Sequence, residues 1–196
     1  VARADYDPLT LAYKGVLIEP ARTNYISNST MQWSGSWPSG WSAVNYGVTP
    51  TVVASGTISG MNYIDVQFLG VGDTVSSASS QRYTNIHFGS FVNTSGNTAW
   101  ATSAYIGYVS GSYPTGTYKS ARLLTALATS VSYLGELNYA QGSVLNYTGA
   151  LKRVGTVGTT TSATVFVRPY FQLAYDQGEA VNLTLRLSLI HISDGA

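Results

Sequence analysis

Aromatic side chains gather in one stretch rich in Gly, Ser and Pro, which reads MQWSGSWPSGWSAVNY from Met31 to Tyr46. Three tryptophans stand four residues apart in it and a tyrosine ends it: Trp33, Trp37, Trp41 and Tyr46. Aromatic faces stack on the apolar faces of sugar rings, and nearby Ser and Asn side chains supply hydrogen bonds. These aromatic residues are therefore a candidate glycan-binding platform.

A second aromatic group follows in YIGYVSGSYPTGTY, residues 105–118. Its members Tyr108 and Tyr113 join the candidate glycan-binding set. The same Trp and Tyr residues suit a structural role equally well, because large aromatic side chains also fill cores and subunit interfaces. The sequence leaves both interpretations open.

Two strand-like segments carry polar and aromatic side chains at alternate positions. The triplets are Tyr63, Asp65 and Gln67 in the first segment, and Arg168, Tyr170 and Gln172 in the second. Alternate residues of a strand point to the same side of a sheet, so either triplet is able to line a groove. An ordinary solvated sheet face has the same pattern.

Groups suited to catalysis are scarce. A Ser-His-Asp triad needs a histidine base, and the chain has 2 histidines, of which His191 continues the apolar face of a strand and His87 stands apart from it. Glycoside hydrolysis needs two carboxylates about 5–10 Å apart, and Asp65 is the one acid on a clear strand pattern. We therefore expect no catalytic residues and no enzyme activity, with a polysaccharide depolymerase as the minor alternative.

Two pairs of carboxylates stand close together in the sequence. They are Asp5 with Asp7 in an apparent turn, and Asp176 with Glu179 in an apparent hairpin loop. Either pair is able to bind a structural Ca²⁺ through its oxygens, although neither has the ligand density of a dedicated calcium loop. Zinc is not expected, because the chain has no Cys and only 2 His. No metal site and no other cofactor are expected.

The composition restricts the partners. Charged residues make up 10% of the chain and the net charge is +1, whereas ordinary soluble domains have about 25% charged residues. The sequence lacks the clustered Lys and Arg that nucleic-acid binding requires. No apolar run is long enough to span a bilayer, so membrane insertion is not expected. The lack of Cys favours a protein made in a reducing cytoplasm and stabilised by packing or oligomerisation.

The elements that carry these residues are expected to be strands, because apolar and polar residues alternate along the chain. The clearest examples are Val181–Ile192, Met61–Phe68 and Ser162–Leu173, in which Val165, Val167, Phe171 and Leu173 are expected to face the core. Pro169 interrupts the last segment and predicts an edge strand or a bulge. Further strands are expected at Gly89–Asn93, Ala99–Val109, Ala121–Thr129, Ser132–Leu137 and Leu151–Val157. The sequence therefore predicts an all-β fold, an antiparallel β-sandwich or jelly roll.

Charged residues are crowded at the front of the chain, around the stretch KGVLIEPARTNY. We expect Gly15–Glu19 to form a short strand that ends at Pro20, since proline cannot donate to a β-ladder. The glutamate before this proline and Arg22 after it are able to pair or to cap the backbone, and a direct ligand site at this stretch is the minor alternative. We therefore expect an N-terminal arm with its opening strand over residues 1–24 and a jelly-roll module over residues 25–196.

The same front segment resembles one found in tailed-bacteriophage virion proteins, of the form R-x-D-Y-D-P-x-T, a short gap, G-x-L-I-E-x-x-R-T-N and then N-S. It covers about a seventh of the chain, and the matching residues are Arg3, Asp5, Tyr6, Asp7, Pro8, Thr10, Gly15, Leu17, Ile18, Glu19, Arg22, Thr23, Asn24, Asn28 and Ser29. The remainder is similar to the carbohydrate-binding-module-like jelly rolls of phage appendages.

This resemblance implies a virion surface protein, such as a fibre, spike or decoration module, that is made in the cytoplasm of a bacterial host. The implied partners are other virion proteins and host or environmental glycans such as surface polysaccharide. A module with few charges, many aromatic residues and no disulfide also suits a homo-oligomer, with a trimer favoured. The alternative is a purely structural capsid or tail component whose aromatic residues pack against neighbouring subunits.

Overall fold

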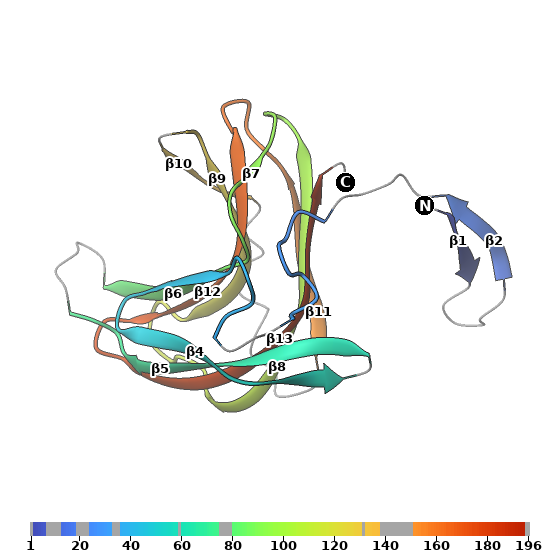
Figure 1. Ribbon diagram of the computed structural model, residues 1–196. Coiled ribbons are helices and arrows are strands. Elements are labelled where there is room, and N and C mark those ends of the chain that lie inside the picture. The colour runs from blue at the N-terminus through green and yellow to red at the C-terminus, as the bar shows by residue number, and fades with distance from the viewer. Residues whose placement is uncertain are drawn as a thin grey trace.

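The computed structural model describes residues 2–6, 13–18, 24–32, 36–58, 60–74, 80–130, 132–137 and 151–194. These residues form two antiparallel sheets packed face to face, and a separate two-stranded hairpin (Figure 1). The strands are β1 Ala2–Tyr6, β2 Tyr13–Ile18, β3 Ser42–Asn45, β4 Val48–Ile58, β5 Met61–Val71, β6 Gln81–His87, β7 Val92–Asn93, β8 Ala99–Ser112, β9 Ser120–Ala128, β10 Tyr133–Leu137, β11 Lys152–Thr159, β12 Phe166–Asp176 and β13 Ala180–Asp194. The predicted all-β antiparallel sandwich is confirmed, and no helix that could cross a membrane occurs among the described residues.

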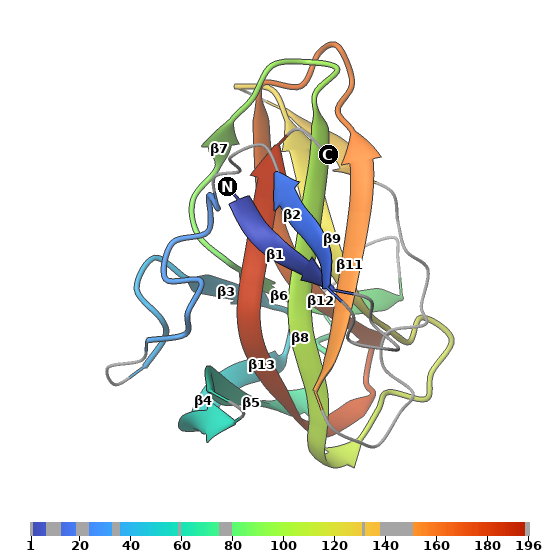
Figure 2. The same ribbon diagram turned by 90° about the vertical axis from the view of Figure 1, so that its right-hand side faces the viewer.

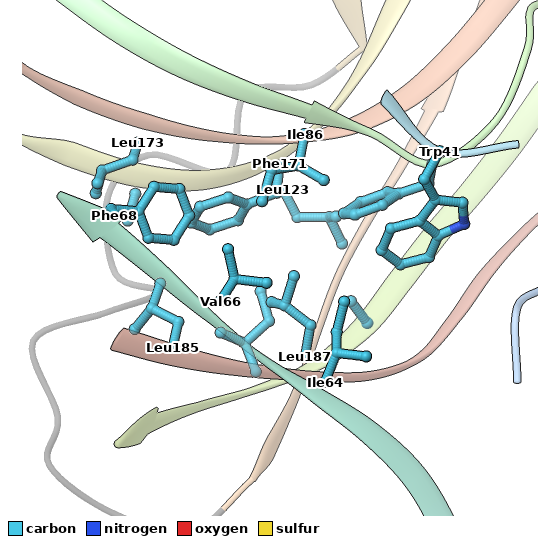
Figure 3. Close-up of a cluster of buried hydrophobic side chains, with 14 of the residues drawn as sticks. Trp41, Ile64, Val66, Phe68, Ile86, Leu123, Phe171, Leu173, Leu185 and Leu187 are labelled. Carbon is cyan, nitrogen blue, oxygen red and sulfur yellow. The ribbon is translucent and has the colours of Figure 1, made fainter. Parts of the chain in front are cut away.

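One sheet has five strands in the order β11-β8-β13-β5-β4. Figure 2 looks onto its long strands β11, β8 and β13, which run side by side. The alternation that predicted β5 and β13 is confirmed, because Ile64, Val66 and Phe68 on β5 are buried and face the other sheet together with Leu185 and Leu187 on β13 (Figure 3).

The other sheet has the order β10-β9-β12-β6-β3, and the short β7 also pairs with β12. The prediction that Pro169 marks an edge strand or a bulge is wrong, because β12 lies in the middle of this sheet between β9 and β6, and its register with β9 runs through Pro169 without a shift. The proline is tolerated there because one side of β12 has no paired strand at this position. On that side β7 pairs with Phe166 and Val167, and β6 pairs from Tyr170 onward. A residue without an N–H therefore faces a gap on that side of the ladder. Val165, expected in the core, precedes β12 and is exposed.

The core lies between the two sheets and is closed at one end by aromatic rings. Phe68 of one sheet contacts Phe171 of the other, with ring centroids 5.8 Å apart. Trp41 packs at the end of this cluster against Phe88, with centroids 4.7 Å apart (Figure 3). Because burying such rings removes large apolar areas from water, this cluster is the main source of the sandwich's stability.

The opening hairpin pairs only within itself, as β1 with β2, and forms a sheet of its own. The predicted short strand Gly15–Glu19 corresponds to β2 up to Ile18. Glu19, Pro20 and Arg22 lie outside the described residues, so their capping role stays a prediction. The division of the chain after residue 24 also stays a prediction.

Candidate functional site

A groove of about 520 Å³ crosses the outer face of the six-stranded sheet. The strands of this sheet bend as they cross the molecule (Figure 1). The groove lies on the face of the sheet away from the core, because its lining residues on β6 alternate with the buried residues of that strand. Its lining comes from β6, β9, β10, β12 and the segment between β6 and β7. The lining residues are Gln81, Tyr83, Asn85, His87, Phe91, Ala126, Tyr133, Glu136, Arg168, Tyr170 and Gln172.

The alternation of two adjacent strands builds the groove. Tyr170 stands opposite His87 and Gln172 stands opposite Asn85 in the β12–β6 ladder. Gln172 Nε2 donates to Asn85 Oδ1 at 3.2 Å. Of the two triplets that the sequence offered as groove linings, the one on β12 does line a groove.

Apolar contacts fix the floor of the groove. Leu124, Ala126 and Tyr170 form a small buried cluster on this face, separate from the main core. The Tyr170 ring lies 5.7 Å from the His87 ring. The tyrosine is therefore held in place by its neighbours before any ligand arrives.

Two phenol groups hold the carboxylate of Glu136. Tyr133 Oη donates to Glu136 Oε1 at 2.7 Å, and Tyr170 Oη donates to the same oxygen. Burial, and then the hydrogen bond to Glu136, raise the pKa of both Tyr133 and Tyr170. Both phenols therefore stay protonated and donate to the carboxylate throughout the physiological range.

A pair of tyrosines lies at the β3 side of the sheet. The rings of Tyr46 and Tyr83 meet edge to face, with centroids 4.9 Å apart. Burial, and then the hydrogen bond to Tyr46, raise the pKa of Tyr83 to about 12. Tyr46, a residue of the predicted platform, is exposed and adjoins the groove through this contact.

The three tryptophans of the predicted platform do not come together as an open surface in the described part of the chain. Trp33 lies outside the described residues, and Trp37 is partly buried against the core. Trp41 is only 7% exposed, and its indole N–H donates to the Ser27 carbonyl at 3.0 Å. Trp41 is therefore a core residue whose ring faces are covered.

Tyr108 and Tyr113, also in the predicted set, pack against the core away from the groove lining. Their ring centroids lie 5.9 Å apart. Tyr108 Oη donates to the carbonyl of Gly111 at 2.6 Å. The structure gives both tyrosines a packing role at the end of β8.

The triplet on β5 faces outward from the five-stranded sheet but is engaged by its own neighbours. Asp65 accepts two hydrogen bonds from Arg186, at 2.7 and 2.8 Å, and is nearly buried. The guanidinium lies 3.7 Å from the Tyr63 ring centroid. Gln67 Nε2 donates to Asn182 Oδ1 at 3.4 Å. These interactions stabilise the sheet face and use the polar groups that a ligand would need.

The candidate calcium pair accepts hydrogen bonds from the backbone. Asp176 accepts the N–H groups of Thr117 and Tyr118, each at 2.8 Å. Glu179 accepts those of Thr115 and Gly116 at 2.6 and 3.1 Å. Within the described ranges, no three acidic or His residues gather as a metal site would require. Asp7 of the other candidate pair, and the side chain of His191, lie outside what the structure describes.

The chain matches no family model and no curated protein. Among solved structures, its fold is similar to carbohydrate-binding modules of the β-sandwich superfamily, with TM-score 0.52 and 11% identity over 86% of this chain and 61% of that chain. An arabinose-bound α-L-arabinofuranosidase aligns with TM-score 0.53 and 12% identity over 87% of this chain and 26% of that chain. The enzymatically active domain of tailspike protein 4 of bacteriophage CBA120 aligns with TM-score 0.50 and 11% identity over 88% of this chain and 21% of that chain.

This chain thus spans between about a fifth and three fifths of the length of those chains. At such low identities the likeness concerns the fold. The chain has the carbohydrate-binding-module-like β-sandwich fold.

Proposed function

We propose that this chain is a non-enzymatic glycan-binding module, and that the groove on the six-stranded sheet is where it holds a sugar chain. The observation that carries the proposal is the combination of aromatic rings and amide groups along that groove. Tyr83, Tyr133 and Phe91 supply apolar ring surface, and Gln172 and Asn85 supply donors and acceptors beside it. A sugar ring needs both kinds of contact, because it has apolar faces and a rim of hydroxyls.

The rigidity of the site supports the same function. The lining side chains mostly project from paired strands and are held by one another, through the Gln172–Asn85 hydrogen bond and the Glu136–tyrosine cluster. A ligand therefore loses little binding free energy to ordering of the protein.

Binding without catalysis is favoured by the distribution of acids. Glu136 is the single carboxylate among the residues found to line the groove. Glycoside hydrolysis by the common mechanisms needs two carboxylates on either side of the scissile bond. Glu136 moreover accepts hydrogen bonds from two tyrosines, so its oxygen is already engaged.

We further propose a place on the surface of a phage particle, in several copies and as a trimer. The support is the opening segment, from Arg3 to Ser29, with its resemblance to tailed-phage virion proteins. Individual sugar sites of this size bind weakly, so several copies on one particle would raise the avidity without new contacts. Detection of the chain by mass spectrometry in purified, protease-washed particles tests this location, and its absence from them excludes it.

The glycan proposal is tested with two double variants that match each other. Asn85→Ala/Gln172→Ala removes the amide pair in the groove, and Gln67→Ala/Asn182→Ala removes the similar pair on the other sheet. Binding to surface polysaccharides of candidate host bacteria is measured by affinity electrophoresis. We expect the groove variant to bind at least about tenfold more weakly, the equivalent of about 1.4 kcal/mol, and the other variant to bind as the original chain does. Equal binding by both variants would place the sugar elsewhere, and no binding by the original chain would leave the particle-building role.

A further inference from the structure

Arg168 differs from two other arginines of the sandwich in its partners. Arg82 pairs with Asp73 at 2.6 Å, and Arg186 pairs with Asp65 at 2.7 Å. Arg168 makes no carboxylate pair within the described residues and lines the groove. Its Nε donates to the Gly89 carbonyl at 2.9 Å and its Nη2 donates to Ser42 Oγ at 3.2 Å.

These contacts fix the guanidinium and leave its charge without an acidic partner. A guanidinium has five N–H donors, so donors beyond the two engaged by Gly89 and Ser42 are available. Phe91 lies against it, with its ring centroid 5.2 Å from Cζ. Burial lowers the pKa of Arg168, which reflects a partly desolvated cation. A partly desolvated cation gains most from a ligand of opposite charge.

His87, its neighbour in the groove, is also incompletely paired. Its Nδ1 is buried without a hydrogen-bond partner among the described residues, whereas its Nε2 is not among the buried atoms, so Nε2 is the nitrogen that faces a ligand in the groove. Burial, and then the charge of Arg168, lower the pKa of His87 to about 4, so the imidazole is neutral near pH 7. A neutral imidazole offers one donor and one acceptor, which suits a sugar hydroxyl.

The single carboxylate among the lining residues does not pair with Arg168. Glu136 accepts from the phenols of Tyr133 and Tyr170 on the β10 side of the groove. Ala126 on β9 lies between Glu136 and Arg168, because it pairs with Glu136 on β10 and with Arg168 on β12. The groove therefore presents an anchored cation at Arg168, the uncharged hydrogen-bonding groups of His87, Asn85 and Gln172, and, on its β10 side, a carboxylate already held by two phenols.

We infer that the glycan bound in this groove carries a carboxylate, as in a polysaccharide that contains uronic acid, and that Arg168 binds this carboxylate while His87 hydrogen-bonds a neighbouring hydroxyl. The inference rests on the proposed function and names the class of glycan. The planar fork of an arginine matches a carboxylate with two parallel hydrogen bonds. Neutral glycans would leave the cation of Arg168 desolvated and unpaired, which costs affinity.

The test uses the full chain with alginate, polygalacturonate and hyaluronan, each beside its carboxyl-reduced form, and with dextran sulfate as a general polyanion. Binding is measured by biolayer interferometry at 0.15 M salt. We expect at least one of the uronate polymers to bind, its carboxyl-reduced form to bind at least about tenfold more weakly, and dextran sulfate to bind no better than the reduced form.

Charge-matched variants locate the carboxylate. Arg153 is exposed on the other sheet and donates from Nη2 to Ser103 Oγ at 3.2 Å, the same distance as the Arg168–Ser42 contact. Arg168→Gln is expected to lose at least about tenfold in affinity for the uronate polymer, Arg168→Lys to lose less, and Arg153→Gln to lose none. Thermal unfolding of each variant accompanies the binding measurement.

The outcomes separate the inference from the proposed function. Equal binding to acidic and carboxyl-reduced forms overturns the carboxylate inference and leaves glycan binding intact, and this comparison does not depend on any variant folding. Equal losses in Arg168→Gln and Arg153→Gln, or strong binding to dextran sulfate, reduce the effect to general electrostatic attraction and also overturn the inference. Binding to none of the uronate polymers overturns the carboxylate inference, and the proposed function is overturned as well only when the surface polysaccharides of candidate host bacteria also fail to bind.

Discussion

Protonation of His87 in the groove is expected to change the free energy of unfolding with pH. Its pKa is lowered to about 4 from its usual 6.5, chiefly by burial and then by Arg168. As the pH falls, the unfolded chain therefore binds a proton at His87 before the folded chain does. The stability that the neutral ring contributes is fully present above about pH 6.5, and it is lost between pH 6.5 and 4. We expect this loss to be about 1–2 kcal/mol, after allowing for solvent screening of a half-buried ring.

His87→Gln isolates this effect, because glutamine does not titrate. Urea unfolding at pH 7 and pH 4.5 should show the free energy of unfolding falling more in the original chain than in the variant. Equal falls in the two proteins would mean that the imidazole is already hydrated and titrates near its usual pKa.

Alanine variants of Trp41 and Tyr83 distinguish an aromatic residue that stabilises the core from one that lines the groove. Trp41 is buried against Phe88, so Trp41→Ala should lower the free energy of unfolding by about 3–5 kcal/mol. Tyr83 lines the groove, so Tyr83→Ala should weaken glycan binding at a smaller cost in stability. Chemical denaturation and glycan binding, measured on both variants, check this. A Trp41→Ala protein of unchanged stability that no longer binds would contradict the core assignment.

At the scale of elements, the β12–β13 hairpin holds the loop that leads from β8 to β9. Carboxylates of Asp176 and Glu179 accept backbone N–H groups from Thr115 to Tyr118. Glu179→Ala should therefore cost about 1–2 kcal/mol and speed amide hydrogen exchange in that loop. Gly116→Ala should do the same, since its Cβ would lie 2.5 Å from Asp176 Cγ. Exchange unchanged in both variants would show that the loop is held by other contacts.

Strands with apolar residues on one face were predictable from the sequence. Val181–Ile192 and Met61–Phe68 alternate clearly, and both became strands of the five-stranded sheet, β13 and β5. The segment around Tyr170 was predicted as a strand with a candidate groove triplet, and that triplet lines the groove.

Strand β6 was not predicted, although it supplies four groove residues. Its core-facing side holds Arg82 and Thr84, so both faces look polar in the sequence. These groups are buried because each has a partner outside its own strand: Arg82 pairs with Asp73 in the preceding loop, and the Thr84 hydroxyl donates to the Val48 carbonyl at 2.7 Å. Pairing of this kind depends on the tertiary fold, which a local pattern does not contain.

The role of the tryptophan stretch could not be predicted from the sequence for a different reason. An aromatic residue in a loop suits a sugar platform or the end of a core, and its type and spacing are the same in both cases. Trp41 belongs to the core because the loop turns its ring onto Phe88. The tyrosines that line the groove come from three different strands, and their proximity depends on the order of strands in the sheet.

At the scale of the whole molecule, the body of the sandwich takes in the chain from about residue 25. Ile26 is buried in the core, and the Tyr25 ring lies 5.3 Å from the ring of Trp100. Among the strands that the structure describes, β1 and β2 pair with each other and with no strand of the two larger sheets. These contacts belong to residues 25 and 26, and the division of the chain after residue 24 stays a prediction.

Two shortened chains test this boundary. Removal of residues 1–24 should leave the melting temperature within about 2 °C of the full chain, because the described strands β1 and β2 pair with each other and not with the two larger sheets. Removal of residues 1–26 takes away only two more residues but includes a core side chain worth about 1.5–3 kcal/mol, so it should lower the melting temperature by about 5 °C. Calorimetry of the three proteins decides between these expectations. A large loss on removing residues 1–24 alone would mean that the arm packs onto the sandwich, and the opening segment would then be part of the module's fold.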